Sequence, residues 1–244
     1  MNSKAISDKN LAIISKYLSF SVGSATCAVP YYNNRRGRAR AKLRAQIGKG
    51  SPQDILDEVE NVAAKEKVNS NALDSTSLKK FMVDGNIGID CSGLVYHILN
   101  PKSLFFPLAT GFIGKLRAKF RPAENASVKC FAHEKNSEEI YLKDVQPGDI
   151  ITMINDERDH ILLIHQVDYQ DSLPGTLHYT HAVAWPTDGE YEHGVRQGII
   201  QITDITRPLS EQSWLEVGKT GPENYTFTRA QKSVATLRRP LFLW

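Results

Sequence analysis

The chain of 244 residues is poor in cysteine and has no long apolar run. It has three cysteines, Cys27, Cys91 and Cys130, and such a small and odd number does not indicate a disulfide framework. No stretch approaches the length of a membrane span, so no transmembrane helix is expected. The first apolar segment contains Asp8 and Lys16, and no signal peptide is visible in it. The localisation is therefore left open, either cytoplasmic or exported by an unrecognised route.

An excess of charge of one sign is also lacking. The 30 Lys and Arg residues against 27 Asp and Glu residues give a net charge of +3, and 41% of the chain is hydrophobic, which is ordinary for a globular protein. The one basic run, from Arg35 to Arg44, favours a solvated face, with contact to a polyanion as the alternative. No aromatic residues are interleaved with this run and no nucleic-acid motif is present, so nucleic acid is not an expected partner.

Helical patterns precede strand patterns along the chain. Residues 10–19 and 51–68 predict amphipathic helices, and Ser51 and Pro52 suit the start of the second. Residues 103–122 are apolar and basic, which favours a helix or a lid over a cleft. Runs of β-branched residues follow from residue 145 onward. This order predicts an α+β fold in which N-terminal helices pack on a central antiparallel sheet.

The stretch GIDCSGLVYHILNP, residues 88–101, places Cys91 at the start of a predicted helix that Asp90 caps and Pro101 ends. The positive end of a helix lowers the pKa of a thiol, and its free amides can stabilise an oxyanion. The negative charge of Asp90 disfavours a thiolate. A cationic partner, most often a histidine, is therefore needed to activate Cys91 as a nucleophile.

Four histidines in predicted strands are candidate partners: His160 and His165 in one strand, and His178 and His181 in the next. The odd spacing within each pair puts its two members on opposite faces, so one histidine from each strand is expected to face the cleft. This pattern does not choose between them. A zinc site that uses all four is not expected, and neither a metal nor a cofactor is predicted.

The segment IDCSGLV resembles the nucleophile motif of the NlpC family of papain-like bacterial cell-wall cysteine peptidases. The segments VQPGDII, DHILLIHQV, YTHAVAW, GVRQGIIQI and VATLRRP resemble later parts of that family in the same order. The resemblance implies an NlpC-like, papain-like peptidase domain over residues 86–244, after an N-terminal helical extension over residues 1–85 that can pack into the same domain. It also implies that Cys91 is the nucleophile at the N-terminus of a helix, that His160 is the general base, and that His181 orients and polarises His160.

Further residues are carried over by the same resemblance. Asp90 and Ser92 are expected near the amino end of the substrate, and Tyr31, with Tyr32 as the alternative, is expected to line the site. The Trp-Gly-Gly that follows this tyrosine in the family is replaced by YNNRR, and long insertions precede Cys91 and fill residues 101–140. These departures affect the segments that shape the cleft.

The implied activity is that of a cysteine amide hydrolase, an endopeptidase of peptidoglycan stem peptides that works through a Cys-His-His triad and an acyl-enzyme. The expected partner is a peptide or muropeptide substrate. One alternative is a thiol acyltransferase on the same scaffold, which the lifetime of the acyl-enzyme with and without an added amine would distinguish. Another is a non-catalytic module that binds the wall or a polyanion, which full biological effect of a Cys91→Ala variant would support.

Overall fold

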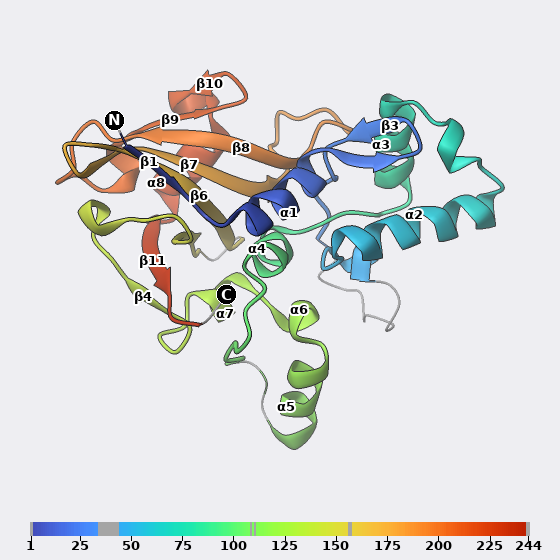
Figure 1. The fold of residues 1–244 in the computed structure, drawn as a ribbon, viewed down its shortest axis with the longest axis horizontal. Coiled ribbons are helices and arrows are strands. Elements are labelled where there is room, and N and C mark those ends of the chain that lie inside the picture. The colour runs from blue at the N-terminus through green and yellow to red at the C-terminus, as the bar shows by residue number, and fades with distance from the viewer. Residues whose placement is uncertain (1, 34–43, 108, 110, 156–157, 243–244) are drawn as a thin grey trace.

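The computed structural model describes residues 2–33, 44–107, 109, 111–155 and 158–242. It has a mixed α+β architecture in which helices pack against one large antiparallel sheet (Figure 1). The α+β class predicted from the order of helical and strand patterns is confirmed.

The main sheet has nine strands, eight of which follow the order β10-β9-β8-β7-β6-β5-β11-β4. The ninth, β1, pairs with the later part of β6, whereas β5 pairs with its first part. The bounds of the nine strands are β1 (Asn2–Ala5), β4 (Ser137–Glu139), β5 (Ile150–Met153), β6 (His160–Gln170), β7 (Leu173–Val183), β8 (Gly194–Gln201), β9 (Ser213–Glu216), β10 (Lys219–Thr220) and β11 (Thr236–Pro240). A separate hairpin is formed by β2 (Phe20–Val22) and β3 (Ala25–Cys27).

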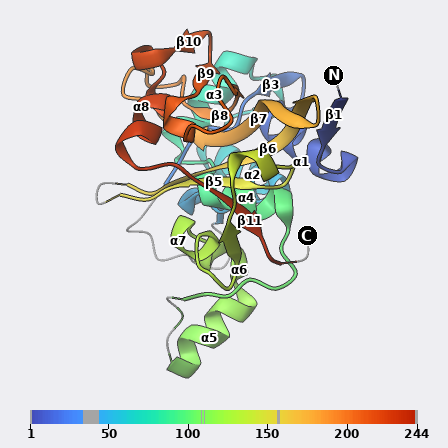
Figure 2. The ribbon, with the colours of Figure 1, turned by 90° about the vertical axis from the view of Figure 1, so that its left-hand side faces the viewer.

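Helices pack on both faces of this sheet (Figures 1 and 2). Their bounds are α1 (Asp8–Leu18), α2 (Pro52–Glu66), α3 (Ser75–Asp84), α4 (Cys91–Leu99), α5 (Gly111–Phe120), α6 (Pro122–Asn125), α7 (Val128–Phe131) and α8 (Tyr225–Lys232). Short 3-10 segments span Arg44–Ile47, Ser70–Ala72, Leu142–Asp144, Leu209–Glu211 and Gly221–Glu223.

Alternation along β6 divides the interior into two hydrophobic cores. Ile161 and Leu163 belong to the first core, to which α1 to α4 contribute, whereas Leu162 and Ile164 belong to the second, to which α8 contributes Ala230. All four β6 residues are fully buried. A strand that is buried on both faces reads as a continuous apolar run, as the letters ILLI do here.

The described residues between positions 2 and 85 share the first core with later parts of the chain. The helix predicted over residues 10–19 corresponds to α1, and the helix predicted over residues 51–68 corresponds to α2. Ser51 caps α2 as predicted and forms a reciprocal capping box with Asp54. This segment also contributes strands, because β1 joins the main sheet and β2 and β3 form their hairpin.

The inserted segment after α4 contains a helix, as one reading of residues 103–122 expected. That helix, α5, projects away from the sheet in both Figure 1 and Figure 2. It does not cover the sheet as a lid in this conformation. The next short helix, α6, instead packs against α4, and the carbonyl of Ala126 just after it accepts hydrogen bonds from two buried side chains close to the start of α4.

Candidate active site

Cys91 is the first residue of α4, and Asp90 is its N-cap. The Asp90 carboxylate accepts a hydrogen bond from the Gly93 amide at 2.6 Å, and the Asp90 amide donates to the Gly48 carbonyl at 2.9 Å. The amides of Cys91 and Ser92 donate to no acceptor among the described residues. Two free amides at the positive end of a helix dipole are therefore available to an anionic oxygen.

Two glycines allow the preceding chain to approach the start of α4. Gly48 has φ +76°, in the left-handed region, and a Cβ there would lie 2.1 Å from the carbonyl oxygen of Tyr32. A Cβ on Gly93 would lie 2.4 Å from the carbonyl oxygen of Gly48. A larger side chain at either position would push the Gly48 loop away from the helix and disturb the Asp90 cap.

A buried lysine joins the two residues that flank Cys91. Lys49 Nζ donates to Asp90 Oδ1 at 2.8 Å, to Ser92 Oγ at 2.7 Å and to the Ala126 carbonyl at 2.7 Å. Lys49, Asp90 and Ser92 are each buried. The side-chain oxygens predicted to bind the amino end of a substrate are therefore engaged with an ammonium group of the protein itself. Lys49 was not predicted from the sequence, because it follows the basic run without any local signal of burial.

The register of β6 and β7 selects one histidine from each strand. Leu163 of β6 pairs with Thr180 of β7. His160 comes three residues before Leu163 and His181 one residue after Thr180. In antiparallel strands these two positions lie toward the same end, and both separations are odd. Both side chains therefore lie on the same face of the sheet, opposite to Leu163 and Thr180. His160 Nε2 is 2.8 Å from His181 Nδ1, and both rings are buried. The structure thus brings together the two histidines that the resemblance implied.

Glu216 extends this pair and was missed by the sequence analysis. His181 Nε2 lies 3.1 Å from Glu216 Oε2, although the pair is not aligned as a hydrogen bond. Tyr179 donates to the same Oε2 atom at 2.8 Å. Burial raises the pKa of Glu216, but the positive charge that His181 carries when protonated, together with the hydrogen bonds of Tyr179 and Thr226, outweighs it and holds this pKa below its usual value. Glu216 is therefore a buried carboxylate that remains charged at neutral pH.

The charge on Glu216 fixes the tautomers of the two rings. A carboxylate can only accept, so the proton of neutral His181 lies on Nε2 and its Nδ1 is an acceptor. His160 then donates from Nε2 to His181 Nδ1, which leaves the lone pair of His160 on Nδ1. In this arrangement His160 Nδ1 is the atom that can take up a proton.

Cys91 is connected to the series Glu216–His181–His160 through the backbone of β6. Its sulfur accepts a hydrogen bond from the amide of Ile161, the residue that follows His160. The Cys91 and His160 side chains form no direct hydrogen bond in the part of the chain that the structure describes. Burial and then the charge of Asp90 raise the pKa of the Cys91 thiol to about 11, against smaller opposing effects of Lys49, the Ile161 amide and Arg229.

The pKa of His160 is shifted in the opposite direction. Burial, followed by the charges of Arg229, His181 and Arg158, lowers it well below its ordinary value. At neutral pH the resting state therefore contains a neutral thiol and a neutral imidazole rather than a preformed ion pair.

Tyr31 and Arg229 are further neighbours of Cys91. Tyr31 forms an isolated bridge with Ile89, and burial followed by the charge of Cys91 raises the pKa of its phenol. Arg229, on α8, is close enough to lower the pKa of Cys91. The structure thus places Tyr31 beside Cys91, as the resemblance implied, and adds an arginine from near the C-terminus that no local pattern indicated.

The other two strand histidines form a separate cluster. His165 Nδ1 lies 3.0 Å from Thr180 Oγ1, and His178 Nε2 lies 2.7 Å from Asp168 Oδ2. Burial and the nearby charge of His178 lower the pKa of His165 to about 4. Among the residues that the structure describes, no group of three or more His, Cys, Asp and Glu side chains is arranged to hold a metal ion.

The basic run from Arg35 to Arg44 lies outside the described residues except for its last member. Arg44 Nε lies 3.2 Å from Glu124 Oε1, so this guanidinium is already paired within the protein. Within the described ranges, no helix is both long and apolar enough to cross a membrane.

Comparison with known proteins adds no identity to this α+β fold. No family model, no curated protein and no solved structure matches the chain.

Proposed function

We propose that the protein is a cysteine-nucleophile amide hydrolase with a papain-like fold, in which Cys91 is the nucleophile, His160 is the general base, and His181 orients and polarises His160. The observation that carries the proposal is the continuous chain from Glu216 through His181 to His160, which ends next to the amide that holds the Cys91 sulfur. In such a series the carboxylate sets the tautomers of the two histidines, and this fixes which nitrogen of the general base accepts the proton.

The proposed reaction begins from the neutral pair. The Cys91 sulfur attacks a carbonyl carbon while its proton passes to His160 Nδ1. The charge of the resulting imidazolium is balanced through His181 by Glu216, and the free amides of Cys91 and Ser92 support the oxyanion. His160 then gives this proton to the leaving amine, which leaves a thioester on Cys91. Water attacks the thioester with His160 as the base again, and the acid and free thiol are released.

The substrate part of the proposal is the peptidoglycan stem peptide implied by the resemblance. The contacts of Lys49 with Asp90 and Ser92 bear on how such a peptide binds. Because one ammonium group already holds these oxygens, we expect the peptide to be recognised without a salt bridge from its own amino end to Asp90. Stem peptides with a free and with an acetylated amino end should then be cleaved at similar rates.

One observation favours a second candidate, a non-catalytic binding module. The Cys91 side chain is only 4% exposed, and its pKa of about 11 leaves almost no thiolate at neutral pH. If His160 gives no assistance in solution, Cys91 behaves as an inert buried thiol.

Cys130 is a built-in control that separates these two candidates. It is 2% exposed and its pKa is also raised to about 11 by burial, but its thiol donates to the Phe105 carbonyl at 3.0 Å and has no imidazole partner among the described residues. A difference in alkylation rate between the two cysteines of one sample therefore reports on the surroundings of Cys91 rather than on its thiol pKa.

The test is the rate of iodoacetamide labelling of Cys91 and Cys130 between pH 6 and 10, followed by peptide mass spectrometry. At pH 7 we expect Cys91 to be labelled about tenfold faster or more, a modest share of what a positioned general base contributes. His160→Ala should remove this excess and His165→Ala, which changes a buried histidine of the same strand, should keep it. Equal labelling of the two cysteines at every pH would reject the hydrolase and support the binding module.

A further inference from the structure

A pocket of about 470 Å³ lies at the end of β7, between α8 and the connection from β5 to β6. Its polar lining includes Arg158, Arg229 and Lys232, together with Asn155 and Tyr225. No described residue that lines it carries a carboxylate. The described residues that line the pocket therefore include three cationic side chains and no anionic one.

The three cations are not neutralised within the described parts of the chain. None of them takes part in an ion pair there, whereas Arg196 lies 2.7 Å from Asp188 and Arg238 lies 2.8 Å from Glu139. Arg229 Nη2 donates to the Arg158 carbonyl, but Arg229 Nε is buried with no hydrogen-bond partner. An unsatisfied buried donor such as Arg229 Nε is costly, so this arrangement requires an explanation.

Arg229 connects this pocket with the candidate active site. Arg229 is half-buried and lies close enough to Cys91 and Tyr31 for their charges to affect its pKa, which burial lowers. Arg158 is two residues before His160, and both Arg158 and Lys232 are exposed. Arg158 and Lys232 thus lie at the surface end of the pocket, and Arg229 lies at its inner end, near the Cys91 thiol.

We propose that this pocket binds an anionic group, a carboxylate or a phosphate, of the molecule that Cys91 attacks. Arg229 pairs with this group at the inner end, and Arg158 and Lys232 attract it at the mouth. The inference rests on the proposed function and adds the charge of the substrate to it. A neutral substrate would leave Arg229 unpaired and would be attacked more slowly.

Two alkylating agents of nearly the same shape test this proposal without knowledge of the substrate. Iodoacetate carries a carboxylate, and iodoacetamide carries a neutral amide. With either reagent the sulfur displaces iodide and forms a thioether, and the thiol proton leaves to His160 or to solvent. At each cysteine the labelling rate with iodoacetate is divided by the rate with iodoacetamide. The measured quantity is this ratio at Cys91 divided by the same ratio at Cys130 in the same sample.

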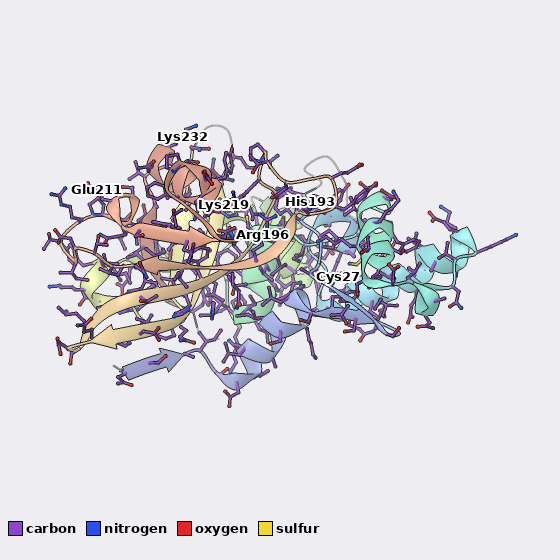
Figure 3. The ribbon with its side chains drawn as sticks, turned by 90° about the horizontal axis from the view of Figure 1, so that it is seen from above. Cys27, His193, Arg196, Glu211, Lys219 and Lys232 are labelled. Atoms are coloured by element: carbon purple, nitrogen blue, oxygen red, sulfur yellow. The ribbon has the colours of Figure 1, made fainter. Side chains whose placement is uncertain are left out.

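We expect this normalised ratio to be about fivefold or more above one in the wild type and to fall as salt is added, because salt screens the cations. Arg229→Gln should return it to about one. Lys232→Gln should lower it in part, and it tests the same pocket from an exposed position if Arg229→Gln does not fold. Lys219→Gln is the control, because Lys219, which is labelled in Figure 3, lies on β10 and already pairs with Glu223.

The outcomes separate this inference from the proposed function. A normalised ratio of one in the wild type, unchanged in both pocket variants, overturns the anion pocket, while His160-dependent labelling by iodoacetamide leaves the hydrolase in place. If neither reagent labels Cys91 faster than Cys130, the hydrolase and the assignment of this pocket to its substrate are both rejected. Competition of iodoacetate labelling by acetate and by inorganic phosphate at equal ionic strength then shows which anion the pocket prefers.

Discussion

The buried carboxylate of Glu216 allows a quantitative test of the proposed proton transfer. Glu216→Gln keeps the shape of the side chain and an oxygen for Tyr179 but removes the negative charge. It also places an amide donor within reach of His181, which can reverse the tautomers of the histidine chain. We expect this variant to fold, because it removes a buried charge rather than creating one.

The size of the effect follows from the geometry. Through the His181 ring, the carboxylate lies roughly 8 Å from His160 Nε2, where two unit charges interact by about 2 kcal/mol at an effective dielectric constant of about 20. Because about 1.36 kcal/mol corresponds to a factor of ten, loss of this charge should destabilise the His160 imidazolium by about 30-fold. The His160-dependent part of the Cys91 labelling rate at pH 7 should fall by this factor.

The assay is the iodoacetamide rate at Cys91 relative to Cys130, with thermal unfolding of each variant measured in parallel. Glu211→Gln is the matched control, because Glu211 is exposed and lies 2.6 Å from Arg207 on the surface. If Glu216→Gln unfolds near the wild-type temperature and keeps the His160-dependent rate within twofold, Glu216 does not support the charge of His160 and the histidine chain has only a structural role.

Three further predictions concern stability. Lys49→Met should lower the free energy of unfolding by about 3–5 kcal/mol in denaturant titrations, because it leaves Asp90 buried without its cation, and a loss below 1 kcal/mol would contradict this. Gly198→Ala should destabilise the fold and disturb Tyr179, because a Cβ would lie 2.3 Å from its hydroxyl oxygen; an unchanged melting temperature would refute the close contact. The pKa of His165 is about 4 in the folded state, which is below its unfolded value. Its contribution to the free energy of unfolding is therefore complete above about pH 6.5 and is lost as the pH falls, by about 2 kcal/mol at pH 5. His165→Gln should remove this part of the acid sensitivity, and identical pH profiles of the two proteins would contradict it.

Local features of the candidate site were accessible from the sequence. The cap at Asp90, the helix that starts at Cys91 and the end of this helix before Pro101 all depend on residues within a few positions of one another. Such features are set by hydrogen bonds to nearby amides and by the restriction that proline places on the preceding residue. The helix at Ser51 was predictable for the same reason.

Features that depend on register were not accessible in this way. The choice of His160 and His181 follows from the Leu163–Thr180 pair and from a register shift between Ile164 and Gln166 that alternation cannot reveal. Glu216 comes from a strand of four residues that lies two strands away from β7, with β8 between them.

Two buried cations were missed because their neighbours are distant in the chain. Lys49 contacts Asp90 and the carbonyl of Ala126, and Arg229 comes to lie near Cys91 only because α8 packs on the second face of the sheet. A charged residue in a sequence is most often solvated, so burial of either side chain has no local signature.

The positions of three buried or half-buried charges, Lys49, Arg229 and Glu216, bear on how the proposed site could use a thiolate although its resting state is neutral. Burial opposes both charged forms of the pair, because it raises the pKa of Cys91 and lowers that of His160. Lys49 and Arg229 lie on the thiol side and favour the thiolate, whereas Glu216 lies on the histidine side and favours the imidazolium. Transfer of one proton from sulfur to nitrogen therefore creates a thiolate near Lys49 and Arg229 and an imidazolium that is linked through His181 to Glu216. The like charges of Asp90 at the thiol, and of Arg229 and Arg158 at His160, oppose this transfer. The stabilisation by Lys49, Arg229 and Glu216 is gained when the proton moves rather than in the resting state, which is what the proposed catalysis requires.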